Sequence, residues 1–102
     1  MGQTAIVRGR ATTVTTVDGD TCVQYHQTTV VRFNASRIVL NSGGWQTVTT
    51  KTRMNQASNQ YELGYHVFQR NYEWFVDFND KTIPFEDGMI LGLRNLVPRK
   101  IK

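Results

Sequence analysis

Apolar and polar positions alternate with a period of two in the first third of the chain. Ala11 to Val17 are almost all Thr and Val, whose β-branched side chains favour strands and resist helix. Asp18-Gly19-Asp20 is a turn signal, and a second β-like run extends from Thr21 to about Phe33. These runs predict a β-hairpin. After a break at residues 34–36, Arg37–Leu40 predicts a short third strand.

A helical period follows the third strand. Apolar and small side chains recur at i, i+4, i+7 and i+11, which predicts one amphipathic helix over about residues 49–63. Thr47 or Thr49 can cap its start, and Gly64 suits its C-terminal cap. The buried stripe is Thr50, Met54, Ala57 and Tyr61, and the predicted polar side is Lys51, Arg53, Asn55, Gln56, Asn59 and Gln60.

The period returns to two after the helix. Tyr65–Gln69 and Tyr72–Phe78 predict a hairpin, followed by a strand over Thr82–Phe85 and a last apolar segment over Met89–Leu93. Three strands, one helix and three or four further strands indicate an α+β fold. We expect the helix to pack on an antiparallel sheet of about five to seven strands. Residues 1–93 would form one domain and residues 94–102 a basic C-terminal tail.

Length and charge limit the classes of function. The 102 residues suit a single domain, and no stretch approaches the apolar length of a membrane span, so we predict no membrane partner. Cys22 is the only cysteine, which fits a reducing cytoplasm. The net charge is +4, which permits a polyanionic partner without requiring one. Residues 1–60 and the tail are mainly basic, whereas residues 61–93 are mainly acidic.

The start of the predicted helix is the leading candidate site. Helix N-termini present unpaired N–H groups and a positive dipole end, where acidic side chains would be stabilising. Here Lys51 and Arg53 occupy the first turn, after a Gly pair and Trp45. This combination suits an anion or nucleic-acid site, and the residues we assign to it are Gly43, Gly44, Trp45, Lys51, Arg53, Arg32 and Arg37. The alternative is a flexible turn and a capped helix with solvated cations. Adjacent glycines without a following Gly-Lys-Ser/Thr exclude a P-loop.

Aromatic residues offer a second candidate surface. Trp74, Val76 and Phe78 share a face of one predicted strand, which favours a core role. Glu73 and Asp77 flank Phe75 on the other face, and carboxylates repel phosphate. Tyr25, Trp45 and Tyr72 are therefore the better candidates for stacking single-stranded bases.

Other chemistry has weaker support, and we assign no catalytic residue, metal site or cofactor. Cys22 and His26 would share a strand face, but no spacing typical of metal ligands accompanies them. His26 or His66 could serve a small metal-free ribonuclease. The acidic residues Asp77, Asp80, Glu86 and Asp87 could hold Mg²⁺, although turn roles explain Asp80 and Asp87 more simply.

Three runs of the sequence carry a resemblance to a known group of proteins: Leu40-Asn41-Ser42-Gly43-Gly44-Trp45-Gln46-Thr47-Val48-Thr49-Thr50-Lys51-Thr52-Arg53-Met54-Asn55-Gln56, Tyr65-His66-Val67-Phe68-Gln69 and Trp74-Phe75-Val76. In these runs the chain resembles short proteins of tailed bacteriophages and environmental phage sequences. The resemblance covers roughly residues 38–90. It implies a setting, the cytoplasm of an infected bacterium, and no particular activity.

These observations lead to one expectation and several alternatives. We expect a non-enzymatic accessory protein that binds nucleic acid or another polyanion through the helix start and the neighbouring strands. The alternatives are a protein-binding inhibitor of a host enzyme or defence system, a small metal-free ribonuclease, and a minor virion component. A homodimer is compatible with a sheet that carries one helix.

Overall fold

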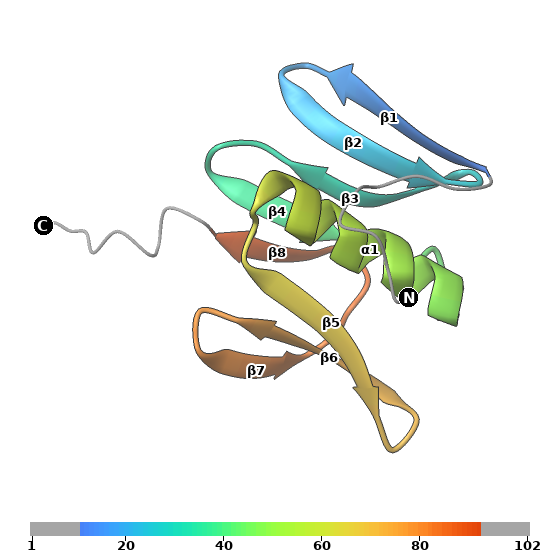
Figure 1. Cartoon of the computed structure of the whole chain (residues 1–102), viewed down its shortest axis with the longest axis vertical. Helices are drawn as coiled ribbons and strands as arrows, with labels where there is room; N and C mark the ends of the chain where they lie inside the picture. The colour runs from blue at the N-terminus through green and yellow to red at the C-terminus, as the bar shows by residue number, and fades with distance from the viewer. Residues whose placement is uncertain (1–10, 93–102) are drawn as a thin grey trace, which may run out of the picture.

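The computed structural model describes residues 11–92, so residues 1–10 and the predicted basic tail lie outside the described residues. The described chain has four strands, one helix and four further strands. All strand pairs are antiparallel, and the strands form one sheet of five and one of three (Figure 1). The α+β class is therefore confirmed. The division of the strands between two sheets was not predicted.

The five-stranded sheet has the order β1-β2-β3-β4-β8. Its strands are β1 (Thr12–Val17), β2 (Asp20–Tyr25), β3 (Thr28–Phe33), β4 (Arg37–Leu40) and β8 (Met89–Gly92). The predicted single run from Thr21 to Phe33 is wrong, because the chain turns at His26, which has a φ of 57°. The last strand, β8, pairs with β4 only after the chain has formed the other sheet. This pairing therefore joins strands that are far apart in the sequence.

The three-stranded sheet has the order β5-β6-β7, with β5 (Tyr65–Arg70), β6 (Glu73–Phe78) and β7 (Lys81–Pro84). Both of its hairpins turn through two residues with positive φ, Asn71-Tyr72 and Asn79-Asp80. Such turns match the right-handed twist of paired strands, which explains the regular register of the sheet. The predicted hairpin over Tyr65–Phe78 is confirmed.

The helix α1 (Val48–Tyr61) lies across the five-stranded sheet and beside β5 (Figure 1). Thr47 is the N-cap, and its hydroxyl accepts a hydrogen bond from the Thr50 N–H, so this predicted cap is confirmed. The prediction that Gly64 caps the C-terminus of the helix is wrong. Glu62, with a φ of 55°, is the C-cap, and its N–H donates to the Ser58 carbonyl.

One core joins the helix to both sheets. The predicted stripe is confirmed, since Thr50, Met54 and Ala57 are buried and Tyr61 is half-buried. The predicted polar side is wrong for Asn55 and Gln56, which are also buried. The main apolar members from the sheets are Val23, Val31, Ile38, Leu40 and Leu91 on one side and Tyr65, Val67, Trp74 and Val76 on the other.

The edge of β5 explains why polar helix residues are buried. The Asn55 side chain donates to the Val67 carbonyl at 2.9 Å and accepts from the Val67 N–H at 2.8 Å. The Ser58 hydroxyl likewise donates to the Tyr65 carbonyl and accepts from the Tyr65 N–H. Two helix side chains thus take the place of a neighbouring strand along this edge.

Candidate nucleic-acid interface at the start of α1

The loop between β4 and α1 is held by its own hydrogen bonds. The Gly43 N–H donates to Asn41 Oδ1, the Gly44 N–H to Ser42 Oγ and the Trp45 N–H to the Ser42 carbonyl. Gly43 has a φ of +67°, and a Cβ there would collide with the Thr28 side chain. The glycine therefore allows the loop to press against the start of β3. These three N–H groups already have partners within the loop.

A carboxylate fixes the same loop from the other side. Asp87 Oδ1 accepts hydrogen bonds from both the Ser42 N–H at 2.8 Å and the Ser42 hydroxyl at 2.7 Å. The Gly88 N–H adds a bond to the Leu40 carbonyl. The Asp87 side chain thus ties the β7–β8 connection to the helix start. Its charge lies where the sequence suggested that a phosphate could bind.

A cavity of about 630 Å³ opens beside this loop. It lies between the β2–β3 turn, the loop and the first turn of α1, and it is lined by Tyr25, His26, Gln27, Thr28, Val30, Ser42, Trp45 and Thr50. Trp45 is 69% exposed, which is unusual for a tryptophan. The lining contains no acidic side chain. Two of the predicted stacking residues, Tyr25 and Trp45, therefore meet at one cavity.

The two cations near the start of α1 point to different sheets, and Arg53 lies in the second turn rather than in the predicted first turn. The Arg53 guanidinium lies 5.7 Å from the centre of the Tyr25 ring, and its Nε donates to Thr12 Oγ1 at 2.8 Å. The Lys51 ammonium lies 5.9 Å from the centre of the Trp74 ring, in the three-stranded sheet. Arg53 therefore stands next to the cavity wall, whereas Lys51 lies on the other side of the helix.

The predicted strand cations are separated from this site. Arg32 is aligned with Cys22 and Val39, whereas the face that packs on α1 carries Val23, Val31 and Leu40. Because side chains alternate between faces, Arg32 lies on the face away from the helix, and Arg37, two residues before Val39, shares it. The structure does not bring Arg32 and Arg37 together with Arg53 and Trp45.

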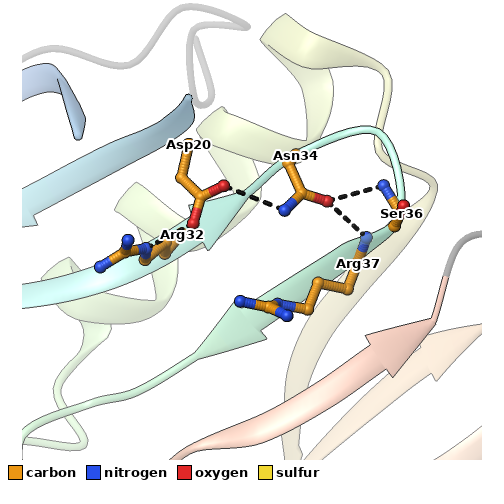
Figure 2. A network of polar contacts seen from close by, with 5 residues as sticks. All are labelled: Asp20, Arg32, Asn34, Ser36 and Arg37. Carbon is orange, nitrogen blue, oxygen red and sulfur yellow. Dashed lines mark hydrogen bonds and ion pairs between the residues drawn. The ribbon is translucent and has the colours of Figure 1, made fainter. Parts of the chain in front are cut away.

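Arg32 belongs to a polar network on that far face (Figure 2). Its Nε donates to Asp20 at 2.7 Å, and the Asn34 amide donates to the same carboxylate at 2.9 Å. The bond from Arg32, followed by that from Asn34, lowers the pKa of Asp20 below its ordinary value. Asn34 Oδ1 also accepts from the backbone N–H groups of Ser36 and Arg37. Arg32 is thus engaged, and the charge of the exposed Arg37 side chain also lowers the pKa of Asp20, by less than the hydrogen bonds from Arg32 and Asn34 do.

The histidines and the cysteine do not form a common site. Cys22 is buried in β2, whereas His26 lies in the exposed β2–β3 turn with its ring 4.4 Å from that of Tyr25, so the predicted shared strand face is wrong. His66 lies in β5, in the other sheet. Residues 11–92 contain no group of three His, Cys, Asp or Glu side chains that could hold a metal ion.

Asp77 and Asp80 serve local roles within their own hairpin. Asp80 occupies a positive-φ turn position, and Asp77 accepts a hydrogen bond from the Thr82 hydroxyl. Asp87 instead makes the long-range contact with Ser42 described above. The turn interpretation therefore holds for Asp80, while Asp87 acts beyond its own turn.

Sequence reasoning did not predict that the β2–β3 turn contributes to the cavity. His26, Gln27 and Thr28 line it because the chain turns back between β2 and β3, and this turn was concealed within a continuous β-like run. The short polar sequence His26-Gln27-Thr28 was the available signal. Tyr72, the third predicted stacking residue, is 93% exposed in the β5–β6 turn, away from this cavity.

Comparison with known families assigns the chain. The family model described as Kyanoviridae Gp96 protein matches residues 3–92, so the chain belongs to this family. The resemblance to proteins of tailed phages is thereby confirmed, and the match includes the N-terminal hairpin that the resemblance did not cover. No curated protein and no solved structure matches the chain significantly. No helix within residues 11–92 is long and apolar enough to cross a membrane.

Proposed function

We propose that this member of the Kyanoviridae Gp96 family is a non-enzymatic accessory protein that binds nucleic acid at the cavity beside Trp45. The observation that carries the proposal is the exposed indole of Trp45 at a cavity of about 630 Å³ that also presents Tyr25 and His26. Aromatic side chains bind single-stranded nucleic acid by stacking on base faces. Bases within a duplex are not accessible in this way, so single strands are the expected ligand.

Charge around the cavity supports an anionic ligand. Arg53 stands beside the cavity wall through its contact with Tyr25. No acidic side chain lines the cavity itself, and the nearby Asp87 carboxylate is engaged by the N–H and hydroxyl of Ser42. The chain as a whole carries a net charge of +4. We assign the first phosphate contact to Arg53. Lys51 would contact a further phosphate where the bound nucleic acid continues around the start of the helix. Gly43 and Gly44 position Trp45 rather than donate to phosphate, because their N–H groups already have partners.

Arg37 and Arg32 have a smaller role in this proposal. They lie on the opposite face of the five-stranded sheet, and Arg32 is paired with Asp20. Exposed cations of this kind raise the affinity for any polyanion without selecting a base. We place the activity in the cytoplasm of the infected bacterial host, where phage nucleic acid is copied and expressed.

Titration of labelled single-stranded and double-stranded DNA and RNA tests the proposal. Fluorescence anisotropy should show preferential binding of single strands, weakening as salt is raised from about 50 to 200 mM because phosphate contacts release counterions. Trp45→Ala should weaken binding by about tenfold, in line with one stacked base. Absence of binding to every probe at the lower salt concentration would refute the proposal.

Matched variants separate the cavity from general effects. Tyr72→Ala removes another exposed aromatic residue, distant from the cavity, and should leave affinity unchanged. Arg53→Gln should weaken binding and reduce its salt dependence, whereas Lys81→Gln removes a charge from the other sheet and should change little. Equal losses in Trp45→Ala and Tyr72→Ala would show that binding does not use this cavity.

A further inference from the structure

The three-stranded sheet has one face in the core and one face turned to solvent. Trp74 and Val76 of β6 are buried in the core, so the residues that alternate with them lie on the opposite, outer face. The register of β5 with β6 aligns the residues of this outer face in three pairs. The pairs that form the outer face are His66 with Asp77, Phe68 with Phe75, and Arg70 with Glu73.

Two phenylalanine rings lie at the centre of the outer face. The rings of Phe68 and Phe75 are stacked with their centres 5.8 Å apart, and both residues are only half-buried. The His66 ring stacks on Phe68 at 6.1 Å, and the Arg70 guanidinium lies 5.5 Å from the centre of the same ring. Apolar rings gain free energy when they leave water, so this cluster favours a partner that covers it.

Polar side chains of opposite character flank the rings on separate strands. His66 and Arg70 lie on β5, whereas Glu73 and Asp77 lie on β6, and all four are exposed. Among residues 11–92 the one ion pair joins Arg32 to Asp20, so Arg70 and Glu73 are not paired within the chain. The outer face therefore offers donors along β5 and carboxylates along β6 to a partner.

We propose that the outer face packs against the same face of a second copy of this chain, with the two-fold axis parallel to the strands and between β5 and β6. This axis lays β5 of each copy over β6 of the other. Because of the register, Arg70 then faces Glu73 of the second copy, and His66 faces Asp77 of the second copy. Phe68 meets Phe75 at the centre, where packed sheets are about 10 Å apart.

The charge pattern selects this axis among the aligned two-fold arrangements. An axis perpendicular to the strands would lay β5 over β5 and β6 over β6, which opposes the cations to each other and the carboxylates to each other. An axis along the middle of β5 or of β6 has the same consequence for that strand. An axis between β6 and β7 would leave Phe68 uncovered. The axis between β5 and β6 covers both rings and opposes each carboxylate to a donor.

The size of this interface predicts a weak dimer. Two strands of six residues form a face of about 20 Å by about 10 Å, well below the about 800 Å² that each partner contributes to a standard interface. Aligned sheets pack at about 30° to each other, which shifts Arg70, about 7 Å from the centre, by only about 3.5 Å. Arginine and glutamate side chains can span this shift. A second copy thus supplies the complementary charges without any further partner.

Analytical ultracentrifugation of the full chain over a wide concentration range tests the dimer. The wild-type chain should pass from monomer to dimer, and Arg70→Glu should raise the dissociation constant at least about tenfold, because carboxylates then oppose carboxylates. Lys81→Glu is the matched control and should dimerise as the wild type does, since it makes the same charge change on the opposite face of the same sheet. A wild-type monomer at all concentrations, or an Arg70→Glu chain that dimerises like the wild type, would overturn the proposal.

A mixture of two charge-reversed chains tests the contact itself. Glu73→Arg should also lose self-association, because it opposes cations to cations. An equimolar mixture of the Arg70→Glu and Glu73→Arg chains should form a heterodimer about as stable as the wild-type dimer, since carboxylates again face guanidinium groups. Mixing cannot repair a folding defect, so recovery assigns the effect to the interface.

The mixture also has an outcome that contradicts the proposal. If both chains remain monomeric when mixed, although each has the circular dichroism spectrum of the wild type, positions 70 and 73 do not face each other across an interface. None of the six outer-face residues lines the cavity beside Trp45, so failure of nucleic-acid binding would leave this result unaffected.

Discussion

The strands β5 and β1 are both edge strands of antiparallel sheets, but only β5 has its outer backbone groups occupied. The N–H and C=O groups of Tyr65 and Val67 bond to the side chains of Ser58 and Asn55. The corresponding groups of Val14 and Thr16 in β1 have no partner among residues 11–92. The outward backbone groups are therefore hydrogen-bonded at the β5 edge, which lies in the core, and are left without a protein partner among residues 11–92 at the exposed β1 edge.

The difference follows from burial. Tyr65 and Val67 lie in the core, where an unpaired N–H or C=O group would lose its hydration without compensation. The edge of β1 is exposed, so water can bond to its outward groups at little cost. An open edge is thus compatible with a stable monomer, and it remains available for a partner strand.

Removal of Asn55 should give the largest effect. Asn55→Ala deletes both bonds to Val67 and leaves two buried backbone groups unpaired, which should lower the free energy of unfolding by about 3 kcal/mol. Urea unfolding followed by circular dichroism measures this change. Asn59→Ala, at an exposed position of the same helix, should change it by less than about 0.5 kcal/mol. Similar values for the two variants would show that the closed edge contributes little.

Tyr65 adds a smaller, pH-dependent contribution at the same edge. Its hydroxyl donates to the Met54 carbonyl at 2.6 Å, and Tyr65→Phe should cost about 1 kcal/mol at neutral pH. Burial raises the pKa of Tyr65 above its ordinary value of 10.0. Above that pH the unfolded tyrosine loses its proton while the folded one keeps it, so stability falls as pH rises.

The fall in stability at alkaline pH can be measured directly. Urea midpoints at about pH 8 and about pH 11 should differ more for the wild-type chain than for Tyr65→Phe, which has no proton to lose. Tyr72→Phe, at an exposed turn, is the matched control and should behave as the wild type. If Tyr65→Phe retains the full alkaline decline, the buried hydroxyl is not its cause.

In the five-stranded sheet, the Asp20 network should make a smaller contribution to stability, and this contribution is lost in acid. Hydrogen bonds from Arg32 and Asn34 lower the pKa of Asp20 below 3.8, so the folded carboxyl stays charged at a pH where the unfolded one is protonated. Its stabilisation is complete above that value and is lost as pH falls through the lower folded pKa. The urea midpoints of wild type and Asp20→Asn should therefore converge between about pH 6 and about pH 2.5. A constant difference would exclude this ionisation as the cause.

Substitution at the open edge should have the smallest effect on the monomer. Val14→Lys, measured in dilute solution, should change the free energy of unfolding by less than about 0.5 kcal/mol, because Val14 is 42% exposed and its outward backbone groups have no partner among residues 11–92. Urea unfolding at low protein concentration checks this. A loss comparable to that of Asn55→Ala would mean that the β1 edge is as important to the monomer as the β5 edge.

Local signals predicted the elements well where each signal had one interpretation. The β-branched run of β1, the turn at Asp18-Gly19 and the Thr47 cap act over a few residues, and the structure contains all three. The turn at His26 was missed because it interrupts a continuous β-like run without glycine or proline. The helix stripe was predicted, but Asn55 was assigned to solvent because periodicity cannot show that a strand edge lies beside it.

The candidate site shows the same limit. Its residues at the helix start were found from the Gly pair, Trp45 and the two cations, which are contiguous in sequence. Sequence could not show that Lys51 and Arg53 point to different sheets. It also could not show that Asp87 bonds to Ser42 across 45 positions of sequence.

The sequence by itself determined the α+β class, the strands with clear periodicity and the single helix, because these depend on interactions between near neighbours along the chain. The tertiary structure alone decided the division into two sheets, the cavity beside Trp45 and the contrast between the closed β5 edge and the open β1 edge. Each of these depends on which distant backbone and side-chain groups are brought out of water together, and a local pattern does not contain that information.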